Sequence, residues 1–188
     1  MASRVSFSGR HLGASAIAEH HRDLQASLHL YFSDVSPSFS TRFLGYLGAE
    51  VMDELGERLE ETDLSSSLAI LASIEAAFRI DYLQRCYRRD KQPISRHFRK
   101  VYKKKGQSAS LDQDIFEAWA IHHAGERFLI AELRGAFRFR HWLAHGRYWT
   151  PKFGRRFNYE DVYTLAEEAL SSFPFFDAIG GNVGVPTH

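Results

Sequence analysis

Residues 65–83, SSSLAILASIEAAFRIDYL, decide the fold. The large apolar side chains of this stretch recur every three or four positions, the spacing that places them on one face of an α-helix. The three serines that precede Leu68 can cap the start of such a helix. We therefore predict a helix from residue 65 to about residue 90, whose buried face is formed by Leu68, Leu71, Ile74, Phe78, Tyr82 and Leu83.

Helical spacing of apolar residues continues over most of the remaining chain. It predicts further helices at residues 13–32, 38–61, 93–105, 111–145 and 159–173. Ser110 with Gln113 can form a capping box at the start of the 111–145 helix, and Gly146 can end that helix in a left-handed cap. Gly125 and Gly135 can bend it. There is no hairpin signal and no internal repeat, so the sequence predicts an all-α fold, an antiparallel bundle of about five to six helices in which Asn158 caps the last.

The length and composition fit one soluble domain. The chain has 188 residues, of which 44% are hydrophobic and 25% are charged, and single cores typically occupy about 100–200 residues. We expect one domain over residues 1–188, with residues 1–12 and 178–188 as flexible tails. No apolar run approaches the roughly 20 residues of a membrane span, and the first residues lack the apolar core of a signal peptide. We therefore expect a cytoplasmic protein without membrane contact, in which the single cysteine, Cys86, is structural.

Charge is segregated along the chain, although the formal net charge is only +1. Residues 85–105 carry ten lysines and arginines against one acid, and residues 133–159 carry seven and no acid. Residues 50–63 show the reverse, with seven carboxylates against one arginine. Clustered positive charge attracts polyanions such as RNA. The same runs are also typical of solvated helix faces, and charge alone leaves both interpretations open.

The most informative stretch for chemistry is residues 138–147, RFRHWLAHGR. His141 and His145 lie one helical turn apart and share a helix face, and the long side chain of Arg140 can reach the same space. Imidazole transfers protons near neutral pH, and guanidinium binds phosphate and stabilises charge that develops on its oxygens. RNA supplies its own nucleophile through the ribose 2′-hydroxyl. The stretch therefore indicates cleavage of RNA phosphodiesters with no metal ion or other cofactor.

This stretch resembles the HEPN superfamily, whose ribonucleases carry an arginine, a polar residue, three further positions and a histidine on a late helix of a helical bundle. The resemblance covers about residues 65–170. It implies an endoribonuclease of the toxin or phage-defence kind, in which Arg140 and His145 are the catalytic pair. His141 fills the polar position, where asparagine or aspartate is commoner. The resemblance also implies a homodimer with two motifs facing one cleft, and a cognate antitoxin or regulatory protein as partner.

Two further groups of residues are candidates for the same site. Glu75, Arg79 and Asp81 form a polar cluster that can orient Arg140 or a histidine, as acidic residues do in some HEPN proteins, or can be an ordinary exposed ion pair. The segment after the motif alternates cations with aromatic side chains. These can hold RNA phosphates and stack on unpaired bases, or can pack the loop against the bundle. With the arginine that begins the stretch, these candidates are Arg138, Arg147, Tyr148, Trp149, Lys152, Arg155 and Arg156.

Three alternatives are open at this point. His145 can simply cap the carbonyl groups of a helix end. His141 and His145 can bind a metal ion together with His122 or His123, although the Glu-x-x-His pattern of metal-binding bundles is missing from the sequence. The whole domain can also be a non-catalytic HEPN-like module that binds or regulates a partner.

Overall fold

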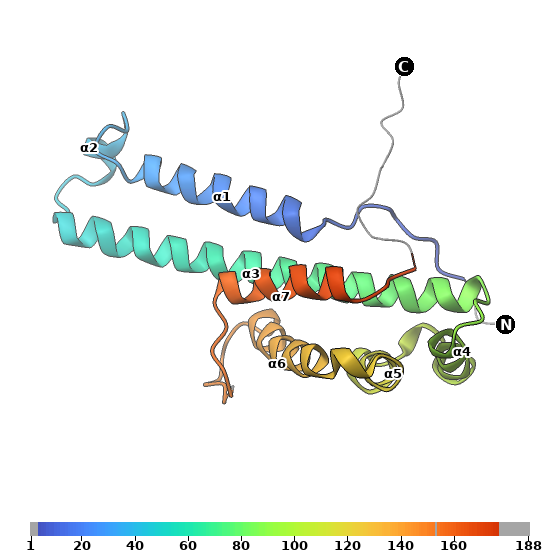
Figure 1. The fold of residues 1–188 in the computed structure, drawn as a ribbon. Coiled ribbons are helices and arrows are strands. Elements are labelled where there is room, and N and C mark those ends of the chain that lie inside the picture. Colours follow the sequence, from blue (N-terminus) through green and yellow to red (C-terminus); the bar gives the residue numbers. More distant parts are fainter. Residues whose placement is uncertain (1–3, 153, 177–188) are drawn as a thin grey trace, which may run out of the picture.

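The computed structural model of the protein describes residues 4–152 and 154–176. Every regular element in these residues is a helix, and the helices pack against one another (Figure 1), which confirms the predicted all-α bundle. No helix in the described ranges has the length and apolar character needed to cross a membrane. The tail predicted at residues 178–188 lies outside the described residues. At the other end, residues 4–12 hold no helix, and Val5 N donates a hydrogen bond to Tyr87 Oη over 3.0 Å.

The longest helix, α3 (Gly48–Tyr87), is the axis of the bundle. At 1.5 Å per residue, its 40 residues span about 60 Å. Four other helices pack against it (Figure 1): α1 (Ala14–Tyr31), α4 (Pro93–Lys105), α6 (Arg127–Ala144) and α7 (Tyr159–Ser172). α3 therefore contributes side chains to the core and also to the surfaces that lie between the helices packed against it.

The predicted apolar face of α3 lies at the centre of the hydrophobic core, except for Leu68, which is only partly buried and lies outside the core cluster. Leu71, Ile74 and Phe78 are completely shielded from solvent. Aromatic rings surround Phe78, whose ring centroid lies 4.9 Å from that of Phe116 and 5.1 Å from that of Phe173. Each such ring buries about 150–250 Å², so this cluster contributes strongly to the packing of α3 against the segments that carry Phe116 and Phe173.

The structure corrects the predicted helix boundary near residues 61–65. The helix predicted at residues 38–61 is the short α2 (Phe39–Arg42) followed by the first part of α3, which runs through residue 65 without a break. Residues 57–67 contain no glycine or proline to stop the helix. The serines do not cap a helix start, since Ser66 Oγ forms a hydrogen bond of 3.0 Å with His21 Nδ1 of α1. The chain turns instead at Gly45, whose φ of 86° lies in the left-handed region.

The helix predicted at residues 111–145 is also divided. It begins as a π-helical turn (Leu111–Phe116), continues as α5 (Glu117–His122), and resumes as α6 after a 3₁₀ turn that contains Gly125. Ser110 caps the first turn as predicted, because its Oγ accepts a hydrogen bond of 3.2 Å from Gln113 N. The return contact comes from Asp114, whose Oδ2 accepts from Ser110 N over 2.7 Å.

Gly135 lies inside α6 without ending it. A Cβ atom at this position would lie 3.3 Å from Cζ of Phe157, so the glycine makes room for that ring. The glycine that was expected to bend the helix therefore serves packing: it lets the segment before α7 approach the backbone of α6 closely.

A buried ion pair ties α3 to its neighbours. Arg85 Nε donates to both carboxylate oxygens of Asp81 at 2.8 Å, and both side chains are almost fully buried. The remaining N–H groups of Arg85 reach Gln92 Oε1 at 2.9 Å, just before α4, and Pro174 O at 2.6 Å, just after α7. Phe176 N donates to Asp81 Oδ1 over 2.8 Å. Because buried charges are tolerated only when they are paired and hydrogen-bonded, this network fixes the ends of three helices together.

We expect Asp81→Ala to lower the free energy of unfolding by about 3–5 kcal/mol, because the buried Arg85 guanidinium then keeps only the more distant Asp90, at 3.8 Å, as counter-ion. Urea unfolding followed by circular dichroism measures the difference. Glu54→Ala is the control: Glu54 binds only the exposed Arg42 and Arg58, and its removal should change stability by about 1 kcal/mol or less. A similarly small loss for Asp81→Ala would contradict the importance of the buried pair.

Candidate functional site

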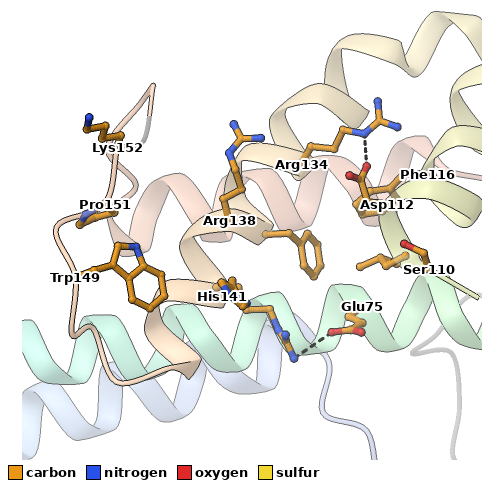
Figure 2. Close-up of a pocket in the computed structure, with 13 residues that line it drawn as sticks. Glu75, Ser110, Asp112, Phe116, Arg134, Arg138, His141, Trp149, Pro151 and Lys152 are labelled. Atoms are coloured by element: carbon orange, nitrogen blue, oxygen red, sulfur yellow. Dashed lines mark hydrogen bonds and ion pairs between the residues drawn. The ribbon is translucent and has the colours of Figure 1, made fainter. Parts of the chain in front are cut away.

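An open pocket of about 690 Å³ lies beside α6. Its lining comes from α3, from the start of the π-helical turn, and from α6 and the loop that follows it (Figure 2). The volume is within the range of about 300–1,000 Å³ that is usual for ligand pockets. Most of the lining side chains are charged or aromatic. They are Glu75, Ser110, Leu111, Asp112, Phe116, Arg134, Phe137, Arg138, Arg140, His141, Trp149, Pro151 and Lys152.

Glu75 of α3 holds Arg140 at this pocket. Arg140 Nη2 lies 3.0 Å from Glu75 Oε2, and the ion pair is drawn in Figure 2. The other oxygen of the same carboxylate, Oε1, accepts a hydrogen bond of 2.7 Å from Arg79 Nε. Arg79 Nη1 in turn donates to Ala109 O over 3.1 Å. One carboxylate thus joins guanidinium groups from two helices, and it contacts Arg140 as the sequence predicts for a supporting residue.

The guanidinium of Arg140 is oriented without being saturated. About a third of its side chain is exposed (32%), and its Nε is buried with no hydrogen-bond partner in the described part of the chain. Buried donors without a partner are rare in folded proteins. Since Glu75 engages only Nη2, Arg140 retains N–H donors for an anion that enters the pocket.

The two histidines of the motif are in contact, but only one of them lines the pocket. The ring centroids of His141 and His145 are 4.2 Å apart, with the ring planes inclined at 56°. His145 is exposed directly after the end of α6 and is not part of the pocket lining. The structure therefore brings Arg140 and His141 together at the pocket and places His145 one turn farther along, against His141.

Trp149 also approaches His141. Their ring centroids are 5.9 Å apart, and Trp149 lines the same pocket (Figure 2). The loop that carries it is held to α6 by a hydrogen bond of 2.8 Å from Trp142 Nε1 to Trp149 O. An indole ring at this position offers a flat apolar surface beside the imidazole and guanidinium groups.

The last turn of α6 ends in the predicted left-handed cap. Gly146 has a φ of 76° and Arg147 a φ of 58°. Gly146 N donates to Leu143 O over 3.2 Å, and Arg147 N donates to Trp142 O over 3.1 Å. These paired bonds are those of the Schellman motif, which satisfies carbonyl groups at a helix end. The motif fixes the direction in which the chain leaves the histidine-bearing turn.

The free cations of the pocket are Arg138 and Lys152, which line it and have no ion-pair or hydrogen-bond partner among the residues described. Arg134 also lines the pocket, but hydrogen bonds from its guanidinium to Asp112 and Glu117 raise its pKa. The sequence motifs did not point to Arg134 or Asp112. The spacing of four residues between Arg134 and Arg138 on one helix face is a signal that could have identified the arginine.

Several predicted site residues lie elsewhere. Asp81 is paired with Arg85 in the core, not with Arg140 or a histidine. Arg147 Nη2 lies 2.8 Å from Glu61 Oε2 of α3 and so anchors the loop instead of lining the pocket. Arg155 forms ion pairs with side chains of α6 and α7. The residues of the predicted RNA-binding segment that are exposed without lining the pocket are Arg147, Tyr148, Arg155 and Arg156.

The histidines that the structure describes do not form a metal-binding group. Within residues 4–152 and 154–176, no three or more histidine, cysteine, aspartate or glutamate side chains are arranged to hold a metal ion. His122, predicted as a further ligand in the metal alternative, contacts His97 instead, with Nε2 3.2 Å from His97 Nδ1.

No family model, no curated protein and no solved structure is significantly similar to the chain. The function is therefore inferred from the residues of the pocket and their geometry.

We expect Gly146→Ala to destabilise the protein by about 1 kcal/mol or more, because an L-residue with a side chain is strained in the left-handed region that Gly146 occupies. Gly56→Ala is the matched control. Gly56 lies inside α3 with open space around the added Cβ, so this change should stabilise by about 0.5–1 kcal/mol. Thermal and urea unfolding of both variants should show these opposite signs; a neutral or stabilising Gly146→Ala would contradict the cap.

Proposed function

We propose that this protein is a metal-independent endoribonuclease of the HEPN kind, acting as a toxin or in phage defence. The observation that carries the proposal is the presence of Arg140 and His141 at one open pocket, with the ring of His145 4.2 Å from that of His141. A guanidinium that binds phosphate and paired imidazoles that move protons are suited to cleavage of a phosphodiester bond. The Arg-polar-x3-His pattern supports the same reaction by resemblance.

The proposed reaction uses the ribose 2′-hydroxyl as nucleophile. Its oxygen attacks the neighbouring phosphorus while an imidazole accepts its proton, and a protonated imidazole donates a proton to the departing 5′-oxygen. The products are a 2′,3′-cyclic phosphate and a 5′-hydroxyl end, so protons and charge balance without a metal ion. Arg140 binds the non-bridging oxygens, on which negative charge increases in the transition state. His145 transfers protons in this proposal, assisted by His141.

The other lining residues are suited to hold single-stranded RNA on either side of the scissile bond. Arg138 and Lys152 are free to bind flanking phosphates, which makes binding sensitive to salt. Trp149 can stack on an unpaired base next to His141. Glu75 positions Arg140 through an ion pair between partly exposed groups, a contact weak enough for a phosphate to compete with it. A cognate antitoxin or regulatory protein would restrain this activity.

We expect the purified protein to cleave mixed-sequence single-stranded RNA in the presence of EDTA and to leave 2′,3′-cyclic phosphate ends. Arg140→Ala and His145→Ala should each slow cleavage by about 100-fold or more, because they remove phosphate binding and proton transfer respectively. Gel electrophoresis gives the rates and mass spectrometry of the fragments identifies the ends.

His20→Ala is the matched control for the histidine variant. His20 is exposed on α1 and does not line the pocket, so its removal should leave the rate unchanged. Circular dichroism and unfolding curves establish that each variant is folded. Equal cleavage by Arg140→Ala and wild type would refute the assignment. Cleavage that needs a divalent ion would favour the metal alternative, and a wild-type protein that binds a partner but cuts no RNA would favour the non-catalytic module.

A further inference from the structure

An arm of the molecule carries large apolar side chains that nothing in the described chain covers. We define the distal arm as residues 24–62, which comprise the end of α1, α2 and the first part of α3; it extends beyond the ends of α6 and α7, with α2 at its tip (Figure 1). Seven of the thirteen large apolar side chains exposed in the described residues belong to its tip. They are Leu30, Tyr31, Val35, Leu44, Tyr46, Leu47 and Met52. Exposed apolar groups concentrated in this way mark an interaction surface.

The distal arm is also strongly acidic. Its two arginines, Arg42 and Arg58, both bind Glu54, at 3.2 Å and 3.5 Å, and Glu61 pairs with Arg147 of the loop after α6. Most of the arm's other carboxylates therefore have no cationic partner in the described residues. Glu57 and Glu60 are exposed on α3 and have no ion-pair partner in the described ranges. A surface that binds this arm must therefore be both apolar and positively charged.

A groove with those properties lies at the opposite end of α3. It has a volume of about 440 Å³ between α4 and α5, and its lining consists of Pro93, Arg96, His97, Lys100, Ile121 and His122. Ile121 is half exposed, and Arg96 and Lys100 are exposed cations that pair with no described side chain. Burial and the neighbouring His122 lower the pKa of His97, while Arg96 and Lys100 give the groove its permanent positive charge.

We infer that the distal arm of one copy of this chain docks in the α4–α5 groove of a second copy. The tip of the arm at α2 and the helices α4 and α5, whose residues line the groove, lie toward opposite ends of α3 (Figure 1). Two copies related by a two-fold axis, with their α3 helices antiparallel, therefore form two identical arm-to-groove contacts at once. Each contact covers the apolar tip with apolar groove residues and sets the carboxylates of the arm beside cations of the groove.

This pairing differs from the one that the HEPN resemblance implies. There, two motifs face one cleft, whereas no residue of the arm or of the α4–α5 groove lines the pocket that holds Arg140. The inference consequently does not rest on the proposed ribonuclease activity. The full chain can be tested for it without RNA.

Sedimentation velocity over about 1–100 µM protein tests the contact by charge reversal. Wild type should form dimers. An arm variant, Glu57→Lys with Glu60→Lys, and a groove variant, Arg96→Glu with Lys100→Glu, should each weaken dimerisation by about tenfold or more, because like charges then face one another. Mixing the two variants should restore a dimer, since the reversed arm meets the reversed groove and the two native surfaces meet as well. Glu168→Lys, an exposed reversal on α7, is the control and should dimerise like wild type.

A tip variant, Leu44→Glu, provides a second measurement if a charge-reversed chain fails to fold. Leu44 is 83% exposed, so the change spares the fold and should also weaken the dimer. A wild type that stays monomeric throughout would overturn the inference. A dimer that survives both reversals and the tip variant would do the same and would favour pairing through the motif.

Discussion

Because α3 stays helical through residues 61–66, one element determines where the parts of this protein lie. Its middle turns bury the apolar face around which the other helices pack, and its outward side presents Glu75 to the pocket. Its later turns hold the buried Asp81–Arg85 pair, to which the entry of α4 and the segment after α7 are bonded. Because α3 is unbroken at the serines, it holds the distal arm at a fixed distance from the half of the molecule that carries the pocket.

The chemistry at the pocket depends on how one carboxylate is shared. Glu75 accepts from Arg79 through one oxygen and pairs with Arg140 through the other, so neither guanidinium receives a two-point contact. A carboxylate that met Arg140 with both oxygens would hold it far more tightly. The observed arrangement sets the direction of the Arg140 side chain and leaves most of its donors available. The same geometry keeps a positive charge close to His141 without neutralising it completely.

Sequence rules that concern a few neighbouring residues correctly predicted the helix ends that such residues cap. They failed where contacts with residues distant in the sequence determine the structure. Gly146 and Asn158 cap their helices as predicted, because a left-handed glycine and an asparagine side chain act within one turn. Ser66 resembles a cap in sequence, but it bonds to His21, forty-five positions away. In the pocket, Arg140 and His141 were found from their spacing. Asp112 was not, since only the tertiary fold brings it to Arg134.

The hydrophobic interior is split into two clusters of very different size. Phe32, Phe43, Val51 and Leu55 pack together in the arm, apart from the main core that surrounds Phe78. A cluster this small contributes little free energy, so the backbone amides around it open by local unfolding at a lower free energy than those of the main core. We therefore expect the arm and the main core to behave as two cooperative units with different rates of hydrogen exchange. The arm can fray and reform while the amides around Phe78 remain protected.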